Sequence, residues 1–337
     1  MTFQMQNNSE SLFPMENGPQ SEILPLLNED FIINVLPQLF NKTTLPPFHS
    51  FLSGQGPETY DLKLDIDSIF DCATDYKPTT NRFVHFTSLA ALNSILSEQG
   101  LRLYNLHNVE DTKEYRLIAK EFDVSEFQLN LLKARVYICS LSPSSILDSD
   151  EVLWYWRKFG NDGMGCAIEF EIEDPIQALS HIKLANVLYS KPDISGFLSA
   201  NIAFEKRHNR KTDLKSLIHL QACLHKNECY KIEKEVRLFY EDGFAEPHRA
   251  CEEHYPYGFD FKNGVPVSYY KVKFYNRSID YPNIKIKRIQ FGPKIKPHDL
   301  KQYEDHFTLL FISMMKRLGV KDELPIIEHS PLVSRLH

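Results

Sequence analysis

The chain has 337 residues, of which 42% are hydrophobic and 25% charged, a composition typical of a globular protein with one large domain or one domain and an extension. Its net charge of −7 argues against nucleic-acid binding driven by bulk positive charge, and no apolar run is long enough to span a bilayer. The polar first twenty residues do not resemble a signal peptide, so the six cysteines are expected to be reduced thiols. We therefore expect a soluble, cytoplasmic protein.

The composition changes along the chain and predicts three parts. Residues 1–22 are rich in Asn, Ser, Glu and Gln and are typical of a disordered lead-in. Residues 23–80 hold two apolar clusters, 31–40 and 62–70, separated by a stretch rich in Pro and Gly. We interpret this part as a helical extension that packs on the main body. Residues 81–337 then form one domain.

The main domain mixes strands and helices without regular alternation. Apolar and β-branched patterning predicts strands at 83–86, 101–104, 136–141, 166–172, 186–189, 232–240, 269–274 and 284–291. Helical spacing predicts helices at 89–99, at 149–159, within 196–229 and from about residue 299. This order favours an α+β domain with mostly antiparallel strands. The glycine patterns of dinucleotide-binding and P-loop motifs are missing from the sequence.

The segment 232–238 is the most informative part of the sequence. If it is a strand, Glu233, Glu235 and Arg237 share one face, and apolar side chains occupy the other. Ionisable groups on a sheet face are costly unless they are paired or line a wet cleft. The segment is therefore a candidate site, although a solvated outer strand with an ion-pair ladder explains the same pattern.

Two further segments contain side chains suited to ligand binding. His85 lies in the middle of a predicted strand, where it could orient a ligand or bond the backbone within the core. The run Trp154-Tyr155-Trp156 precedes a glycine-rich turn and could wall a pocket for a flat ring, or could equally plug the core.

The remaining acidic and metal-ligating residues have weaker patterns. Asp111 and Glu114 are three residues apart, so they could reach one partner or could simply charge the first turn of a helix. A set of histidines and cysteines was compared with known zinc spacings: His219, Cys223, His225, Cys229, Cys251 and His254. Their spacing matches no standard pattern, so no metal site is predicted.

Five motifs in one order resemble a bacterial family classed as a domain of unknown function. They are Val84 to Ser88, Asp111 to Glu114, Cys139 to Ser142, the run from Trp154 through Gly160, Gly163 and Gly165 to Ile168, and Lys226, Tyr230, Glu233, Glu235 and Arg237. The strand end Phe291-Gly292-Pro293 also fits, and the resemblance covers residues 81 to about 330.

More distantly, the order of a histidine on the first strand, an aromatic residue in a middle segment and a glutamate on a late strand resembles the ADP-ribosyltransferase fold. That resemblance implies a split, mostly antiparallel sheet with flanking helices and a cleft for NAD. It implies that His85 holds the nicotinamide ribose, Tyr155 supports the nicotinamide pocket and Glu235 bonds a ribose hydroxyl. The residues then expected to bind the dinucleotide are Thr87, Ser140, Trp154, Arg237, Lys226, Glu233, Asp111 and Glu114.

From this resemblance we expect an enzyme that takes NAD as a substrate, needs no metal and modifies a macromolecule, either protein or nucleic acid. Bacterial stress or phage defence is the setting we expect for it. A carboxylate beside the ribose would stabilise the oxocarbenium-like centre formed when nicotinamide leaves. Two other hypotheses stay open. One is a non-enzymatic sensor that binds a nucleotide or a protein. The other is a metal-dependent hydrolase or nuclease that uses Asp111, Glu114, Glu233 and Glu235.

Overall fold

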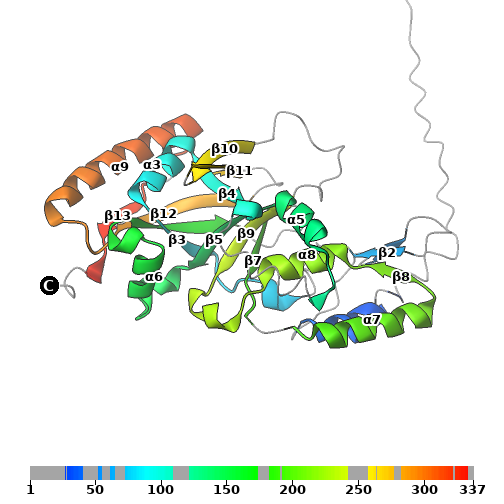
Figure 1. The fold of residues 1–337 in the computed structure, drawn as a ribbon. Coiled ribbons are helices and arrows are strands. Elements are labelled where there is room, and N and C mark those ends of the chain that lie inside the picture. Colours follow the sequence, from blue (N-terminus) through cyan, green and yellow to red (C-terminus); the bar gives the residue numbers. More distant parts are fainter. Residues whose placement is uncertain are drawn as a thin grey trace, which may run out of the picture.

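A computed structural model describes most of the chain beyond residue 72 and a few earlier segments. The described residues are 27, 29–40, 52–54, 61–64, 73–108, 121–173, 182–189, 192–241, 257–262, 264–276, 282–321 and 323–332. Over these ranges the protein is an α+β structure with one large, mostly antiparallel sheet and helices on both of its faces (Figure 1). The expected α+β class with a mostly antiparallel sheet and flanking helices is confirmed.

The large sheet has ten strands, and its longest path runs β10-β11-β4-β5-β3-β6-β12-β13, with β9 and β7 branching from β5. Only the terminal pair, β12 and β13, is parallel. The strands are β3 (Arg82–Thr87), β4 (Gly100–Asn105), β5 (Val136–Pro143), β6 (Cys166–Glu173), β7 (Ile182–Asn186), β9 (Val236–Glu241), β10 (Tyr257–Lys262), β11 (Val265–Lys273), β12 (Asn283–Phe291) and β13 (Ile326–His329).

The sheet divides at β5. One edge of β5 pairs with β9 from Val136 to Leu141. Its other edge pairs with β4 near Ile138 and with β3 at Ser142 and Pro143. Strands β3 and β4 therefore diverge from the same edge of β5, and Ser140 lies where they separate. Because neither strand covers it, Ser140 is exposed although its neighbours Cys139 and Leu141 are buried.

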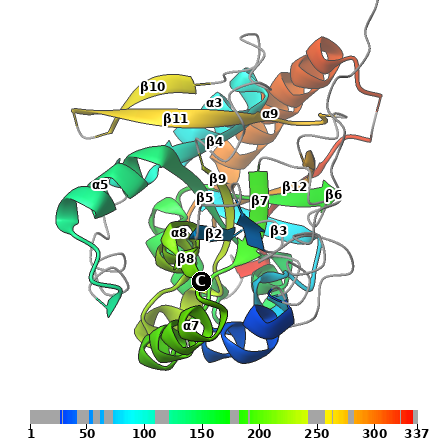
Figure 2. The same ribbon diagram turned by 90° about the vertical axis from the view of Figure 1, so that its right-hand side faces the viewer.

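Helices cover the two faces of the sheet unequally. They are α3 (Leu89–Glu98), α5 (Glu126–Arg135), α6 (Val152–Lys158), α7 (Ile194–His208), α8 (Lys215–Leu224) and α9 (Pro297–Leu318). Short 3-10 helices span Leu36–Gln38, Thr74–Tyr76, Leu106–Asn108, Ser144–Asp148, Asn161–Gly163 and Glu228–Glu233. Helices α3 and α9 pack together on one face, whereas α6, α7 and α8 lie toward the other (Figures 1 and 2). No helix in the described ranges is long and apolar enough to cross a membrane.

Strand alternation sorts the apolar side chains into separate cores. On β9, Val236 and Leu238 join the core under α3 and α9, while Phe239 joins a core formed with α7 and α8. On β3, Val84 and Phe86 join a third core built around α6. The polar side chains of β9 therefore lie on the same sheet face as two apolar cores, those of α6 and of α7 with α8.

The described part of the N-terminal extension belongs to the core of α7 and α8. Phe31 packs edge-on against Phe204 of α7, with ring centroids 5.2 Å apart. The extension is not purely helical as predicted, because it contributes strands β1 (Leu52–Gly54) and β2 (Asp61–Leu64). These pair with each other, and β2 pairs in parallel with β8 (Lys211–Asp213). Since β8 is about 150 residues later in the chain, local patterning could not reveal this partner.

The predicted strand at 232–240 is wrong at its beginning. The strand starts only at Val236, and Glu233 ends the 3-10 helix Glu228–Glu233. Lys234 has a left-handed backbone with φ of 41°, which separates the two elements. Ile232 is consequently 39% exposed and does not join the core face assigned to it. Strand β7 likewise begins at Ile182, earlier than the predicted 186–189.

Candidate functional site

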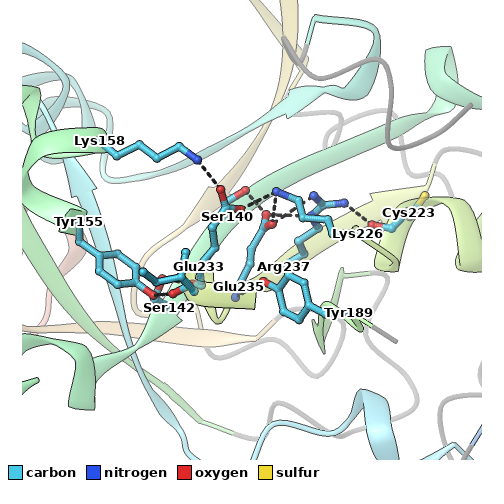
Figure 3. Close-up of polar contacts among 11 residues, drawn as sticks. Ser140, Ser142, Tyr155, Lys158, Tyr189, Cys223, Lys226, Glu233, Glu235 and Arg237 are labelled. Atoms are coloured by element: carbon cyan, nitrogen blue, oxygen red, sulfur yellow. Dashed lines mark hydrogen bonds and ion pairs between the residues drawn. The ribbon is translucent and has the colours of Figure 1, made fainter. Parts of the chain in front are cut away.

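Five charged side chains form one connected network, which we call the ion cluster: Lys158, Lys226, Glu233, Glu235 and Arg237. Figure 3 shows them converging from α6, from the segment after α8, and from the start of β9. The cluster contains three cations and two carboxylates. All but Lys158 are largely buried, and buried charges are tolerated only when opposite charges compensate them, as they do here.

Glu235 lies at the centre of the ion cluster and has both of its carboxylate oxygens occupied. Oε1 accepts hydrogen bonds from Ser140 Oγ and from Arg237 Nε, the latter at 2.8 Å. Oε2 lies 2.8 Å from Lys226 Nζ and 3.2 Å from Arg237 Nη2. Burial alone would raise the pKa of Glu235, but attraction to Arg237 and then Lys226 outweighs it and lowers the pKa to about 2. Glu235 is therefore ionised at neutral pH.

Arg237 is held in place from two sides. Its Nη1 donates to the carbonyl oxygen of Cys223 at the end of α8, while its Nε and Nη2 donate hydrogen bonds to Glu235. Arg237 pairs across the sheet with Ser140 of β5 and with Ala185 of β7. A small alanine on one side leaves room for the guanidinium to lie along the sheet face.

Glu233 forms the outer half of the ion cluster. Its Oε1 lies 2.5 Å from Lys158 Nζ and its Oε2 lies 2.7 Å from Lys226 Nζ. Lys226 also contacts Glu235, so one ammonium bridges the two carboxylates. Glu233 and Glu235 thus converge as the sequence predicts, although a turn at Lys234 and not a shared strand face brings them together.

Backbone contacts fix the segment that carries the two glutamates. Tyr189 Oη accepts a hydrogen bond of 2.8 Å from the backbone N–H of Glu235, and burial raises the pKa of this tyrosine. Ser142 Oγ donates to the carbonyl oxygen of Glu233 at 3.2 Å, and Tyr155 Oη donates to that of Ile232 at 2.6 Å. Three hydroxyl groups from β5, α6 and the segment after β7 therefore hold residues 232–235.

Solvent reaches the ion cluster at two places. Ser140 is exposed at the division of the sheet, and its hydroxyl bonds directly to the buried carboxylate of Glu235. The side chain of Lys158 is 41% exposed, whereas that of its partner Glu233 is only 6% exposed. The buried carboxylates are thus in contact with an exposed serine and a half-exposed lysine.

His85 contacts Ser140, the residue whose hydroxyl bonds Glu235 of the ion cluster. Its Nδ1 lies 3.0 Å from the carbonyl oxygen of Ser140, at the point where β3 leaves β5. Strand alternation places His85 with Phe83, on the opposite face of β3 from Val84. Because Glu235 contacts the hydroxyl of Ser140 on the other face, the histidine and the glutamate approach the same residue from two sides.

The aromatic helix α6 both fills the core and borders the ion cluster. Tyr155 and Trp156 are fully buried against Phe86, so they plug the core. Trp154 is half-buried, and its ring lies 4.9 Å from Lys158 Nζ. In the glycine-rich turn, Gly165 packs so closely against the end of β3 that an added Cβ would lie 2.1 Å from the backbone oxygen of Thr87.

Four of the other predicted residues lie outside the described residues: Asp111, Glu114, Cys251 and His254. Cys223 contacts the ion cluster through its backbone carbonyl oxygen, which accepts a hydrogen bond from Arg237. Cys223 and His225 are buried, and Cys229 is exposed. Among the residues that the structure describes, no three His, Cys, Asp or Glu side chains are grouped so that they could hold a metal ion.

Sequence reasoning named four residues of the ion cluster and missed Lys158, and it assigned no site role to Tyr189 or Ser142. The helical spacing of Trp154 and Lys158, four residues apart, was the available signal for the first, since residues at this spacing share a helix face. Tyr189 and Ser142 have no such local pattern. Both act on backbone groups of residues distant in sequence.

Comparison with known families adds one match. A family model described as "Protein of unknown function (DUF2971)" matches residues 155–238. The expected resemblance to a family of unknown function is confirmed over this segment. The match holds all five residues of the ion cluster, but not β3 or β5 with His85 and Ser140. No curated protein and no solved structure matches the chain.

The DUF2971 segment therefore supplies the charges, and the preceding strands supply the surface on which they lie. A buried pair of carboxylates is suited to stabilise positive charge that develops on a substrate. The flanking ammonium and guanidinium groups are suited to bind the oxygens of a phosphate or carboxylate. The site thus offers both signs of charge within a few ångströms.

Proposed function

We propose that this protein is an enzyme that uses NAD as a substrate and transfers its ADP-ribosyl group to a macromolecule in the manner of an ADP-ribosyltransferase. The observation that carries the proposal is the convergence of Glu233 and Glu235 on Lys226, at 2.7 and 2.8 Å, next to the exposed residue Ser140. Departure of nicotinamide leaves positive charge on the ribose, and two carboxylates held together can stabilise that charge.

The two carboxylates are proposed to have different roles. Glu235 is nearly surrounded by Ser140, Arg237 and Lys226, and it sets the electrostatics of the site while remaining ionised. Glu233 depends on Lys158, whose side chain is 41% exposed and ends a helix. Movement of Lys158 would open one oxygen of Glu233 to a ribose hydroxyl or to the reacting carbon. The bond broken is the glycosidic bond to nicotinamide, and the acceptor nucleophile forms the new bond as it loses its proton.

The test is release of nicotinamide from NAD by the purified protein, with and without cell extract. Glu233→Gln and Glu235→Gln keep the size of each side chain and remove its charge, so each should slow release by about 100-fold or more. Glu171→Gln is the matched control, because Glu171 lies on β6 in a partly exposed ion-pair ladder outside the ion cluster. Equal release by wild type and both variants, with folding verified by circular dichroism, would contradict the proposed roles.

A second candidate function is a binding module without turnover, such as a cytoplasmic sensor of a nucleotide. The favouring observation is that both oxygens of Glu235 already have partners, which is typical of a carboxylate with a structural role. Calorimetry with NAD distinguishes the two. Binding of intact NAD without nicotinamide release supports the module. Transfer of a label from NAD to protein or nucleic acid in the cell extract supports the transferase.

A further inference from the structure

The ammonium of Lys158 is enclosed by aromatic rings. Its Nζ lies 4.9 Å from the ring centroid of Trp154, 5.1 Å from that of Phe159 and 5.5 Å from that of Tyr230. The Trp154 and Phe159 rings meet at 84°, so they form two perpendicular walls. A cation within about 6 Å of a ring face is attracted by its quadrupole, and three such faces make an aromatic cage.

The floor of this cage is a carboxylate. Glu233 Oε1 lies 2.5 Å from Lys158 Nζ, and its side chain is only 6% exposed. Three rings and one buried carboxylate are the components that recognise an alkylated ammonium group. In this structure the protein's own lysine occupies the position where such a cation would bind.

We propose that Trp154, Phe159, Tyr230 and Glu233 form a binding site for a methylated ammonium group, and that Lys158 is its displaceable internal occupant. The Lys158 side chain is 41% exposed and extends from the last residue of α6, so it can leave toward solvent without disturbing the core. Lys226, at 12% exposure and with both glutamates as partners, stays in place.

The immediate contacts of this position favour a cation over an anion. When Lys158 leaves, the two glutamates remain matched by Lys226 and Arg237, and Glu233 Oε1 loses its cationic partner. An incoming ammonium restores that partner and the original charge. An incoming anion would instead meet the carboxylate of Glu233 and the negative faces of the rings. The inference does not rest on the proposed NAD chemistry, because it concerns binding alone.

The experiment is calorimetric titration of wild type and of Lys158→Ala with choline and with its neutral isostere 3,3-dimethyl-1-butanol. Removal of the internal competitor should strengthen choline binding at least about tenfold, while the isostere should stay weak in both proteins. In the Lys158→Ala background, Trp154→Ala and Tyr230→Ala should each weaken binding by about two- to fivefold. Phe261→Ala, which removes an exposed ring of β10, is the control and should change nothing.

A further pair of titrations distinguishes a protein side chain from a small molecule as the source of the ammonium group. A peptide containing trimethyllysine that binds more tightly than choline, with no binding of the unmodified peptide, identifies a protein side chain. Tighter choline binding identifies a small molecule. The inference is overturned if Lys158→Ala binds choline no better than wild type does, if the neutral isostere binds equally well, or if inorganic phosphate binds while choline does not. Nicotinamide release plays no part in these outcomes.

Discussion

Substitution of Arg237 by methionine tests whether the ion cluster is one coupled unit. The guanidinium is 4% exposed and supplies two of the contacts to Glu235, together with the bond to the Cys223 carbonyl. Methionine keeps much of the apolar stem but leaves Glu235 with Lys226 as its only cation. Removal of one partner from a buried ion pair typically costs about 3–5 kcal/mol, because the other charge stays buried and poorly compensated.

The pKa of Glu235 gives a second way to calculate the stability lost when Arg237 is replaced. Its lowering from 4.5 to about 2 corresponds to roughly 3 kcal/mol of preference for the charged form. Both Arg237 and Lys226 contribute to this preference, and Arg237 is the larger contributor. We therefore expect Arg237→Met to lower the free energy of unfolding at pH 7 by about 3 kcal/mol.

Urea denaturation followed by circular dichroism measures this change. Arg82→Met is the matched control, because Arg82 pairs with buried Glu169 at 3.4 Å but is itself 46% exposed, and Arg288 remains to compensate that glutamate. The control should lose less than about 1 kcal/mol. Equal losses in the two variants, or a loss below about 1 kcal/mol in Arg237→Met, would refute the reasoning.

The stability difference between wild type and Arg237→Met is predicted to depend on pH. The pKa of Glu235 is lowered in the folded state, so its stabilisation is fully present above about pH 4.5 and is lost as the pH falls toward about 2. Arg237→Met raises that pKa, and the stability difference between the two proteins should therefore shrink through this window. Burial lowers the pKa of His225 to about 4 in both proteins, so each also loses stability below pH 6.5. The difference between them is consequently the quantity to measure.

Two further substitutions test the packing around the site. Tyr155→Phe removes the hydroxyl that bonds the Ile232 carbonyl at 2.6 Å and should cost about 1 kcal/mol in urea denaturation, whereas an unchanged midpoint would show that this bond contributes nothing. Gly165→Ala would place a Cβ 2.1 Å from the backbone oxygen of Thr87 and should cost about 2–3 kcal/mol in thermal unfolding. Gly264→Ala, at a φ of 79° with open space around it, should cost only about 1 kcal/mol, and a larger loss there than at Gly165 would contradict the packing argument.

Much of the sheet could be predicted because its strands alternate clearly. Strands β3, β5, β6 and β12 occur where apolar residues recur at every second position or in short β-branched runs. Helix α9 was similarly marked by apolar spacing over more than four turns, and its Phe307, Phe311 and Met314 are buried. In these elements the local pattern and the tertiary environment favour the same structure.

The local geometry of the ion cluster was less predictable. The alternation of Glu233, Glu235 and Arg237 suggested one strand, but the hydroxyls of Ser142 and Tyr155 hold the preceding residues in a 3-10 turn. Those hydroxyls come from elements about 80 to 90 residues earlier. Only the assembled fold reveals such partners, and the same is true of the division of the sheet at β5.

The central position of β5 has a consequence for biosynthesis. Ser140 and Glu235 are separated by 95 residues, so β5 and β9 can pair only after the later strand has been synthesised. At a synthesis rate of 5–20 residues per second, one edge of β5 leaves the ribosome about 5–20 s before its partner does. During that interval a buried strand of the final protein presents an open edge to other chains. Protection of nascent β5 is therefore a requirement that the sheet topology imposes on the cell that makes this protein.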